Sequence, residues 1–433
     1  MKGIEEKQIE APYELPEGWK WCRLGDFINI FRGVSYKKND AHNEKQENDC
    51  LIIRGGNIDE GCINLNSDNV FVNKSLVSEN QIIKKNDVII VTSTGSIKVI
   101  GRAGVSASDY EDVAFGAFLT LARPNEKANK SFVNQYFQSS LYRERIRQLA
   151  SGVNINNIRI EYITESPFPL PPTLVEQQRI VNRIESMFAK LDEAKEKAQN
   201  VVDDFETRKA AILHKAFTGE LTAKWRKENG VSDDSWEEKL FDSCIAKMQN
   251  GLSKRSGNEG EETVVLRLAN MGEDDFDVSD LRTIKLTSKE KNNYSLSKND
   301  VVMIRVNGSK TNVGRQLLVK NNKGWSFCDH IIRIQFEVFC LPNYMVYFSK
   351  TKEYIDYVQD NMVSSAGQNT ISRKGLSNLS LKVPTLPEQV DIVRILDIII
   401  EKENKAKQAA EAVLEQIDLL KKSILARAFR GEL

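Results

Sequence analysis

The chain has 433 residues, of which 40% are hydrophobic and 28% are charged. This length and composition are typical of a globular protein with two or three domains, each large enough to bury a core. Its 61 basic side chains are balanced by 61 acidic ones, whereas nucleic-acid-binding domains are usually basic. The balance excludes a uniformly basic DNA binder. A DNA-binding chain of this composition would gather its cations on one face or share phosphate contacts with a partner.

The sequence carries no signal for a membrane or for secretion. No apolar run reaches the roughly 18 residues that a membrane span requires, and residues 1–14 are charged rather than apolar. None of the six cysteines forms a C-x-x-C pair, so neither zinc nor a redox motif is indicated. We therefore expect a cytoplasmic protein with reduced thiols and no membrane contact. The cysteines are Cys22, Cys50, Cys62, Cys244, Cys328 and Cys340.

Motifs of the first half of the chain return in the second half at a nearly constant spacing. Internal repeats of this kind decide the domain organisation and are sought first. Two copies are too few for a solenoid, so they indicate a duplicated unit with approximate two-fold symmetry. The matching runs are Lys-Asn-Asp-Val at 85–88 and 298–301, Gly-Ser at 95–96 and 308–309, Gly-Arg at 101–102 and 314–315, Glu-Gln at 176–177 and 388–389, and Ala-Phe-x-Gly-Glu-Leu at 216–221 and 428–433.

The first part of each copy predicts a mixed, strand-rich domain. Residues 88–91 and 301–304 are short apolar runs that follow an Asn-Asp turn signal, which is typical of buried strands. Helical stretches are expected near residues 131–149 and 343–360. These patterns place globular domains at residues 1–170 and 222–383.

The second part of each copy predicts one long helix, over residues 171–221 and 384–433. Prolines open each helix, and Gly219 and Gly431 stand where each would end. Apolar residues recur in steps of four and three, which is a heptad seam that Arg208 interrupts in one copy and Glu403 in the other. The seam residues are Ile180, Ile184, Met187, Leu191, Ala194, Ala198, Val201, Phe205 and Ile212 in the first copy and Ile392, Leu396, Ile399, Ala406, Ala410, Val413, Ile417, Leu420 and Ile424 in the second.

Neither helix can bury its seam alone, so the simplest arrangement packs the two against each other. A two-fold relation makes them antiparallel and places the globular domains at opposite ends. A helix of about 40 residues is about 60 Å long, which corresponds to about one to two turns of B-DNA. The predicted fold is therefore α/β (α+β), with two globular domains separated by two long antiparallel coiled-coil helices in a pseudo-two-fold internal repeat.

Four segments resemble the specificity subunits of type I restriction-modification enzymes. They are residues 15–19 (Leu-Pro-Glu-Gly-Trp), 54–58 (Arg-Gly-Gly-Asn-Ile), 171–181 from the paired prolines through Glu-Gln-Gln-Arg-Ile-Val, and 215–221. The resemblance covers nearly the whole chain in the family's order: target recognition domain, helix, target recognition domain, helix. The second copy departs mildly, with Pro-Thr-Leu-Pro-Glu-Gln at 384–389 and with Asp-Asp-Ser, in place of Leu-Pro-Glu-Gly, before Trp236.

The resemblance implies a function and a set of partners. Each recognition domain would bind one half of a split double-stranded DNA target, and the helices would set the spacing between the halves. The helices would also dock two methyltransferase subunits, and two motor-nuclease (restriction) subunits would join for cleavage. The two recognition domains diverge in sequence, so their half-sites are expected to differ. S-adenosylmethionine, ATP and magnesium are expected on the partner subunits, with no cofactor bound by this chain.

Catalytic motifs are not apparent in the sequence. The three histidines, His42, His214 and His330, lack metal-ligand spacing. There is no G-x-x-x-x-G-K-[ST] phosphate loop and no Asn-Pro-Pro-aromatic run of the kind that adenine methyltransferases carry. We therefore expect a non-enzymatic chain with no catalytic residues and no metal site. Two alternatives stay open: a coiled-coil scaffold that joins two proteins without DNA, and an enzyme whose site has no familiar motif.

The candidate DNA-binding residues form two groups in each copy: one follows the predicted buried strand, and the other lies at residues 152–157 and 367–370. Arg, Asn, Gln, Ser and Thr supply the donors and acceptors that base edges require, and Lys and Arg bind phosphates. Lys37-Lys38 and Lys84-Lys85 are further candidates for phosphate contacts. The DNA candidates are Ser93, Thr94, Ser96, Lys98, Arg102, Asn154 and Asn156 in the first copy and Arg305, Asn307, Ser309, Lys310, Asn312, Arg315, Gln368 and Asn369 in the second. The candidates on the partner-binding helices are Glu176, Gln177, Phe217, Glu388, Gln389 and Phe429.

Overall fold

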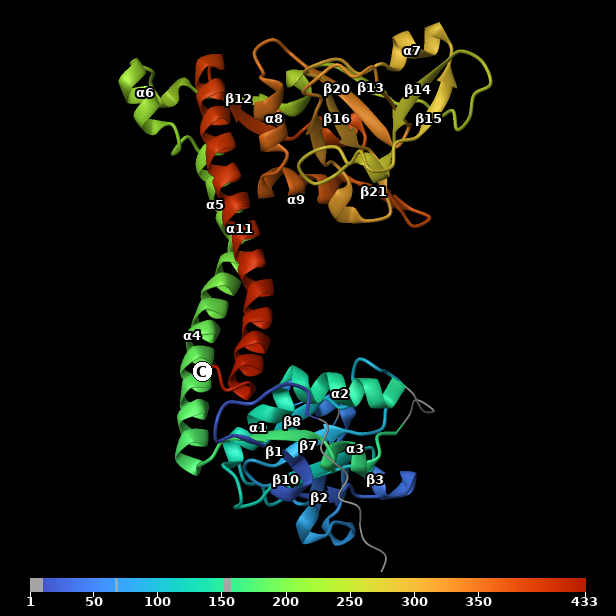
Figure 1. Cartoon of the computed structure of the whole chain (residues 1–433). Coiled ribbons are helices and arrows are strands. Elements are labelled where there is room, and N and C mark those ends of the chain that lie inside the picture. Colours follow the sequence, from blue (N-terminus) through green and yellow to red (C-terminus); the bar gives the residue numbers. More distant parts are fainter. Residues whose placement is uncertain (1–10, 67–68, 152–156) are drawn as a thin grey trace, which may run out of the picture. The chain divides into compact units, whose positions relative to one another are not determined.

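The computed structural model describes residues 11–66, 69–151 and 157–433, and it divides the chain into two compact units. Unit 1 comprises Met1–Gln199 and Glu411–Leu433, and unit 2 comprises Asn200–Ala410. Each unit contains a globular part of strands and short helices, which we call head 1 and head 2, together with a share of the long helices (Figure 1). The mixed α/β class predicted from the sequence is confirmed. Among the described residues, no helix is long and apolar enough to cross a membrane.

Head 1 contains one central sheet of five strands in the order β2-β10-β7-β8-β5, beside a four-stranded sheet β3-β6-β4-β9 and the pair β1-β11. In the central sheet, β2, β10, β7 and β8 are joined by antiparallel ladders. The strands are β1 (Lys20–Arg23), β2 (Ile28–Arg32), β3 (Ala41–His42), β4 (Asp49–Ile53), β5 (Gly61–Cys62), β6 (Phe71–Asn73), β7 (Val88–Val91), β8 (Ala103–Val105), β9 (Val113–Phe115), β10 (Leu119–Pro124) and β11 (Pro167–Leu170).

Head 2 repeats this arrangement with one more small sheet. Its central sheet has the order β13-β20-β16-β18 with antiparallel ladders throughout. The others are β12-β23, β15-β14-β19 and β17-β22-β21. The strands are β12 (Glu237–Leu240), β13 (Ile245–Asn250), β14 (Glu261–Leu266), β15 (Thr283–Leu286), β16 (Val301–Ile304), β17 (Val306–Asn307), β18 (Gln316–Leu318), β19 (Ser326–Phe327), β20 (Ile331–Phe336), β21 (Val363–Ser365), β22 (Gln368–Thr370) and β23 (Ser380–Val383).

Helices α1–α3 of head 1 and α8–α10 of head 2 follow the last strand of the central sheet, whereas α7 precedes strand β16. The predicted stretch 131–149 is two helices, and so is the stretch 343–360, because each is interrupted near a serine. The helices are α1 (Lys130–Gln138), α2 (Ser140–Ser151), α3 (Ile160–Thr164), α4 (Leu174–Asp203), α5 (Phe205–Phe217), α6 (Ala223–Asn229), α7 (Ser288–Tyr294), α8 (Pro342–Phe348), α9 (Lys352–Asn361), α10 (Arg373–Leu376) and α11 (Leu386–Phe429).

The predicted buried strands β7 and β16 are the centres of their heads. Every residue of both strands is buried. Each strand follows an asparagine with a positive φ, 70° at Asn86 and 73° at Asn299, a conformation that asparagine tolerates better than most residues. The Lys-Asn-Asp-Val run is therefore a turn that delivers the chain into the sheet in both heads.

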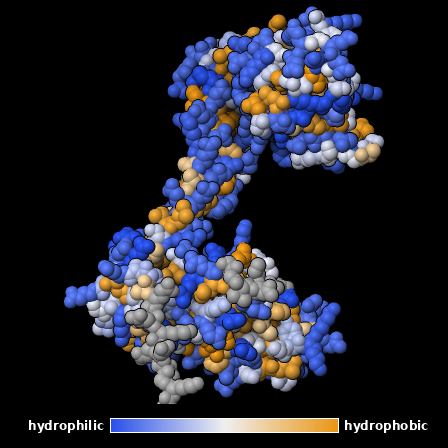
Figure 2. Space-filling view, turned by 45° about the vertical axis from the view of Figure 1, so that its right-hand side comes forward, coloured by the Kyte–Doolittle hydropathy of each residue, from blue (hydrophilic) through white to orange (hydrophobic). Residues whose placement is uncertain are grey.

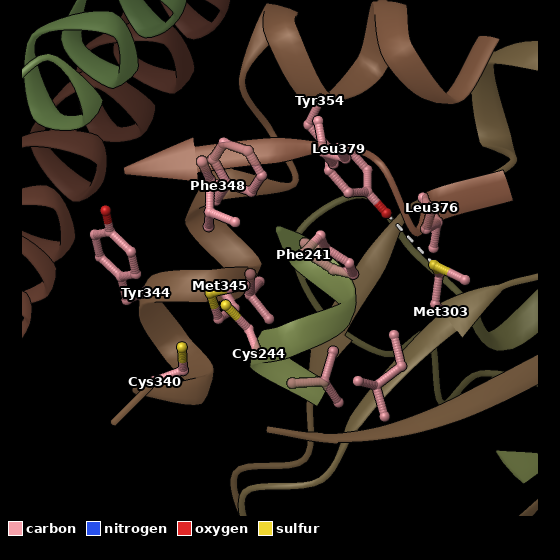
Figure 3. Packing of buried hydrophobic residues seen from close by; sticks show 14 of the residues in the cluster. Phe241, Cys244, Met303, Cys340, Tyr344, Met345, Phe348, Tyr354, Leu376 and Leu379 are labelled. Carbon is pink, nitrogen blue, oxygen red and sulfur yellow. Dashed lines mark hydrogen bonds between the residues drawn. The ribbon is translucent and has the colours of Figure 1, made fainter. Parts of the chain in front are cut away.

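Aromatic side chains close the core between each central sheet and its helices. In head 2, Phe241, Phe348 and Tyr354 pack together in stacked, tilted and edge-to-face pairs (Figure 3). The Tyr354 hydroxyl, which is fully buried, lies 3.0 Å from the carbonyl oxygen of Gly314 and 3.4 Å from the sulfur of Met303. The same hydroxyl accepts a hydrogen bond from Gln316, so this polar group is satisfied inside the core.

The long helices pack in opposite directions within each unit. In unit 1, Ile180 and Ile184 of α4 share a buried cluster with Leu425 and Phe429 of α11, and Lys421 pairs with Asp192. In unit 2, Leu213 and Ala216 of α5 share a cluster with Ile392, Leu396 and Ile400 of α11. Gly219 and Gly431 have φ values of 84° and 72° just beyond the ends of α5 and α11, as their sequence positions predict.

One prediction about the helices is wrong in detail: the first copy is two helices, α4 and α5, rather than one. The interruption is at Asp204. The Arg208 guanidinium donates to the carbonyl oxygen of Val201 at 2.9 Å, and side chains that enter the backbone ladder in this way interrupt helices. Arg208 also pairs with Glu403 of α11 at 2.8 Å. The two polar residues of the predicted seams therefore contact each other.

Glutamine side chains join each head to its long helix. The Oε1 atom of Gln177 accepts a hydrogen bond from the backbone N–H of Asn129, and that of Gln389 accepts one from Leu341, both at 2.7 Å. Asn129 and Leu341 are the N-cap residues of α1 and α8. The Nε2 atoms donate to the carbonyl oxygens of the prolines that precede the helices. Both glutamines are buried, so they fix the helix start against the head.

Candidate DNA interface

Four segments of head 1 converge where strands β2, β4, β7 and β9 end. The Val34 N–H donates to the carbonyl oxygen of Phe115 at 2.7 Å, and the Gly116 N–H donates to that of Ile53 at 3.0 Å. The Ser93 N–H donates to the carbonyl oxygen of Phe118 at 3.1 Å. We call this place the four-segment edge; in head 1 it comprises residues 33–38, 53–57, 92–98 and 115–118.

The same edge exists in head 2, with the same pattern of backbone hydrogen bonds. Leu252 donates to Phe327 at 2.9 Å, Cys328 to Leu266 at 3.0 Å, and Val306 to His330 at 3.3 Å. Here the four-segment edge comprises residues 251–255, 266–270, 305–312 and 327–330.

A glycine is required in each head where the first segment crosses the last. A Cβ atom on Gly33 would lie 2.1 Å from the carbonyl oxygen of Gly116, and one on Gly251 would lie 2.1 Å from that of Cys328. No larger residue fits there without moving the backbone. The close approach therefore brings loops from distant parts of the chain to one surface.

The structure brings together both groups of DNA candidates predicted in head 2. Strand β17 pairs with β22, with Asn307 opposite Asn369. The Asn369 Nδ2 atom donates to the carbonyl oxygen of Gly308 at 2.9 Å, and the Asn307 Oδ1 atom accepts from the Ser309 N–H at 2.8 Å. Asn369 is buried and positions the loop, whereas Ser309, Lys310 and Gln368 are exposed beside it.

In head 1 the residues that follow the second candidate segment contact the loop after β7. Ser93 forms an isolated antiparallel bridge with Asn157, and the Ile158 N–H donates to the carbonyl oxygen of Thr92 at 2.8 Å. Asn154 and Asn156 lie outside the described residues. Ser96 and Lys98 are exposed, while Ser93 and Thr94 are half-buried. In head 2 both predicted segments thus lie side by side, and in head 1 the described residue Asn157 lies beside the first segment.

Arg102 and Arg315 contact the chain itself. The Arg102 Nη1 atom donates to the carbonyl oxygen of Ile58 at 3.2 Å, and that of Arg315 donates to Met271 at 3.4 Å. Arg315 also donates to Asn312 Oδ1 at 2.7 Å. In head 1 the hydrogen bond joins the loop after β7 to the loop after β4. In head 2 the hydrogen bond to Met271 joins the loop after β16 to the loop after β14. In this structure both arginines position the four-segment edge, and Asn312 supports one of them.

Sequence reasoning missed a basic cavity at the edge of head 2. The cavity has a volume of about 260 Å³ and a floor formed by Val265, Leu268 and Ile284. Arg255 corresponds in the repeat to Lys37 of head 1, so comparing the two copies position by position is the signal that identifies this site. The basic side chains that line the cavity are Lys254, Arg255, Arg267, Arg282 and His330.

Acidic neighbours hold these cations in place. Lys254 pairs with Glu290 at 2.9 Å, Arg255 with Asp329 at 2.8 Å, and Arg267 with Asp280 at 2.8 Å. Hydrogen bonds from Lys254 and then from Thr287 lower the pKa of Glu290 to about 2, so this carboxylate is charged at neutral pH. The neutral composition of the chain therefore coexists with a locally basic cavity.

Cys328, Asp329 and His330 bring three potential metal-ligand atoms within 4.8 Å of one another. Burial raises the pKa of the Cys328 thiol, which favours its protonated form. Burial also opposes ionisation of Asp329, but Arg255 and His330 outweigh it and hold its pKa below the ordinary value. A protonated thiol beside a carboxylate already paired with arginine is a poor donor set for a cation.

The predicted residues on the helices are mostly inside the junctions with the heads. Glu388 is fully buried and accepts hydrogen bonds from Thr222 and Arg226, both at 2.7 Å. Phe429 is buried, and Phe217 packs on Tyr344 with ring centroids 4.9 Å apart. Glu176 is partly exposed and pairs with Arg179 at 2.8 Å. Partner contacts at these helix starts must therefore come chiefly from neighbouring exposed residues.

Comparison with known proteins identifies the class. A family model described as the type I restriction modification DNA specificity domain matches residues 16–202 and 242–416. The chain is 35% identical over 422 residues to the type I restriction enzyme StySPI specificity subunit of Salmonella potsdam, an alignment that covers 97% of this chain and 90% of that protein. It is 31% identical over 423 residues to the EcoKI specificity subunit of Escherichia coli strain K12, with coverage of 97% and 90%.

The fold also matches a solved structure, the HsdS subunit from Thermoanaerobacter tengcongensis. The TM-score is 0.63 at 20% sequence identity, with 98% of this chain and 100% of that chain covered. The class defined by these matches is a non-catalytic subunit that supplies DNA sequence specificity. The chain belongs to the family of type I restriction-modification specificity subunits.

Proposed function

We propose that this specificity subunit binds a bipartite DNA target, with one half-site contacted by the four-segment edge of each head. The observation that carries the proposal is that the same three backbone hydrogen bonds join the four segments in both heads. Loops that leave a rigid sheet are suited to DNA recognition because the scaffold fixes their donors and acceptors. Exposed Lys98 and Lys310 are assigned to phosphates, and Ser96, Ser309 and Gln368 to base edges.

The lysine and arginine side chains of the basic cavity of head 2 are assigned to the DNA backbone. The lining cations of the cavity are held by carboxylates that a phosphate can replace as the partner. The apolar floor offers no competing acceptor to these cations. Figure 2 shows hydrophilic residues over most of the visible surface, with hydrophobic residues in scattered patches. A polar surface of this kind suits a wet protein–DNA interface.

The long helices are proposed to act as the spacer between the half-sites. Helix α11 has 44 residues and is therefore about 66 Å long. The antiparallel packing within each unit supports an antiparallel coiled coil and a pseudo-two-fold repeat. The proposed organisation has a recognition domain at 1–170, a helix at 171–221, a second recognition domain at 222–383 and a second helix at 384–433.

Partner subunits are proposed to bind beside the helix starts. Leu174 and Val175 of α4 are 54% and 80% exposed, and Leu386 and Val390 of α11 are 42% and 55% exposed. Leu174 and Leu386 occupy equivalent positions of the repeat. Exposed apolar residues at both helix starts suit two copies of one partner, the methyltransferase subunit. Two restriction subunits would complete the enzyme, in the cytoplasm, with S-adenosylmethionine, ATP and magnesium bound by these partners.

The proposal is tested by co-expressing the chain with its cognate methyltransferase subunit and mapping methylated sites across a genome. The expected result is one motif composed of two specified half-sites and an unspecified gap of fixed length. A second measurement selects bound duplexes from a random pool. A single continuous motif, or no enriched motif in both measurements, would contradict the proposal and favour a scaffold without DNA.

A further inference from the structure

Phe118 of head 1 is an exposed aromatic residue on a rigid turn. Its side chain is 70% exposed, and among the phenylalanines that the structure describes it is the one classed as exposed. The turn is closed by a hydrogen bond from the Leu119 N–H to the carbonyl oxygen of Gly116 at 2.9 Å. The Phe118 carbonyl oxygen accepts from the N–H groups of Thr92 and Ser93, both at 3.1 Å. The backbone therefore holds the ring at the surface.

The corresponding residue of head 2 is His330. Its carbonyl oxygen accepts from the N–H groups of Arg305 and Val306 at 2.8 and 3.3 Å, as that of Phe118 does from Thr92 and Ser93. The side chain of His330 is 38% exposed, and its Nδ1 atom lies 3.1 Å from Asp329 Oδ1. One backbone position thus presents an apolar ring in head 1 and a hydrogen-bonding ring in head 2.

The surroundings of Phe118 favour DNA over a protein partner. Its neighbours across the turn are the polar segment Thr92–Ser96 and the polypeptide that carries Lys37 and Lys38. Protein-binding surfaces usually gather several large apolar side chains into one patch. Within the four-segment edge of head 1, Ile97 is the other exposed large apolar residue, at 44%, and most of the remaining exposed residues are polar or basic. A ring in this mainly polar setting suits a base instead, because phenylalanine contacts the thymine methyl group or inserts between base steps.

We propose that position 118/330 is a base-contacting position: the apolar ring of Phe118 contacts bases of the first half-site, and His330 contacts the second. This inference rests on the proposed function and assigns specificity to one shared scaffold position. It explains how two heads with the same backbone crossings recognise different sequences.

The test uses the full chain assembled with its methyltransferase subunits, after the wild-type motif has been mapped. Phe118→Ala is expected to weaken binding to that motif by roughly 5- to 100-fold, the effect of losing a base-specific contact. The altered or relaxed positions should lie in the first half-site only. His330→Ala should alter the second half-site only. Leu76→Ala, which trims another exposed apolar side chain of head 1, is the matched control and should leave the motif unchanged.

Modified duplexes identify the kind of base contact. If Phe118 contacts a thymine methyl group, replacing thymine by uracil in the first half-site should weaken the wild type but not Phe118→Ala. If the ring inserts between base steps, 2-aminopurine at the step should brighten with the wild type only. An unchanged motif and affinity for Phe118→Ala would overturn the inference. The inference would also be overturned if Phe118→Ala failed to co-elute with methyltransferase subunits in size-exclusion chromatography. A wild type without a bipartite motif would instead overturn the proposed function.

Discussion

Heads 1 and 2 share a backbone scaffold and differ in the side chains that the scaffold exposes. Shared positions hold the backbone: Asn86 and Asn299 turn the chain into the sheet, and Gln177 and Gln389 fix the helix starts. Position 118/330 lies on the same scaffold but carries different chemistry. The duplicated chain thereby separates residues that maintain structure from residues available for recognition.

At the junctions between the heads and the long helices, the residue is the same in both units but its burial differs. The glutamates at equivalent positions of the repeat show this. Glu388 is fully buried with Arg226, whereas Glu176 pairs with the half-exposed Arg179. Removing one partner of a buried ion pair leaves an uncompensated charge, while exposed pairs contribute little. The following predictions test these differences and similarities between the two units.

The largest effect is expected for Arg226→Leu. The variant leaves the Glu388 carboxylate buried without a cation, so we expect a loss of about 3–5 kcal/mol in the free energy of unfolding. Arg179→Leu, the matched change in unit 1, should cost about 0–1 kcal/mol. Urea denaturation of both variants measures the difference. Equal losses would show that the two junctions are energetically alike.

Gln177→Leu and Gln389→Leu should have equal effects in the two units. Each variant leaves a partly buried backbone N–H at a helix N-cap without its acceptor, at an expected cost of about 1 kcal/mol. Hydrogen exchange at the Asn129 and Leu341 amides should accelerate in the respective variant. Arg183→Leu, a change at an exposed residue of the same helix, is the control. Unchanged amide exchange would mean that these glutamines do not fix the junctions.

Lys98→Ala and Lys310→Ala should weaken DNA binding without changing the motif. Each removes one proposed phosphate contact, so the slope of log K against log salt should fall by about 0.9 for each lost contact. Binding isotherms at several salt concentrations measure this slope. A changed half-site with an unchanged salt slope would reassign the lysine to a base contact.

The smallest effect is expected for the pair between Arg208 and Glu403. Both side chains are partly exposed, at 36% and 25%, so Glu403→Gln should change stability by about 0–1 kcal/mol. A double-mutant cycle with Arg208→Lys measures the coupling between the two residues. A coupling above about 2 kcal/mol would show that the pair determines the helix register.

The sequence predicted the elements whose signals are local. Strands β7 and β16 follow from apolar runs after turn residues, and the ends of α5 and α11 follow from Gly219 and Gly431. The interruption at Asp204 was not predicted, because it depends on the Arg208 side chain bonding to a backbone carbonyl of the preceding turn.

Long-range contacts explain what sequence reasoning missed at the candidate site. Arg102 and Arg315 have the chemistry of DNA-binding residues, but each donates to a carbonyl more than 40 residues away. The cavity of head 2 is lined by residues from 254 to 330 that no local pattern connects. Burial likewise distinguishes Glu388 from Glu176, although both stand in the same Glu-Gln motif.

An exchange of heads tests the central claim most directly. Residues 1–170 are replaced by the corresponding region of another family member, and the methylated motif is mapped in cells that also express the methyltransferase subunits. We predict that one half-site changes while the other half-site and the gap length stay the same. Simultaneous change of both half-sites, or change of neither, would contradict the assignment of one half-site to each head.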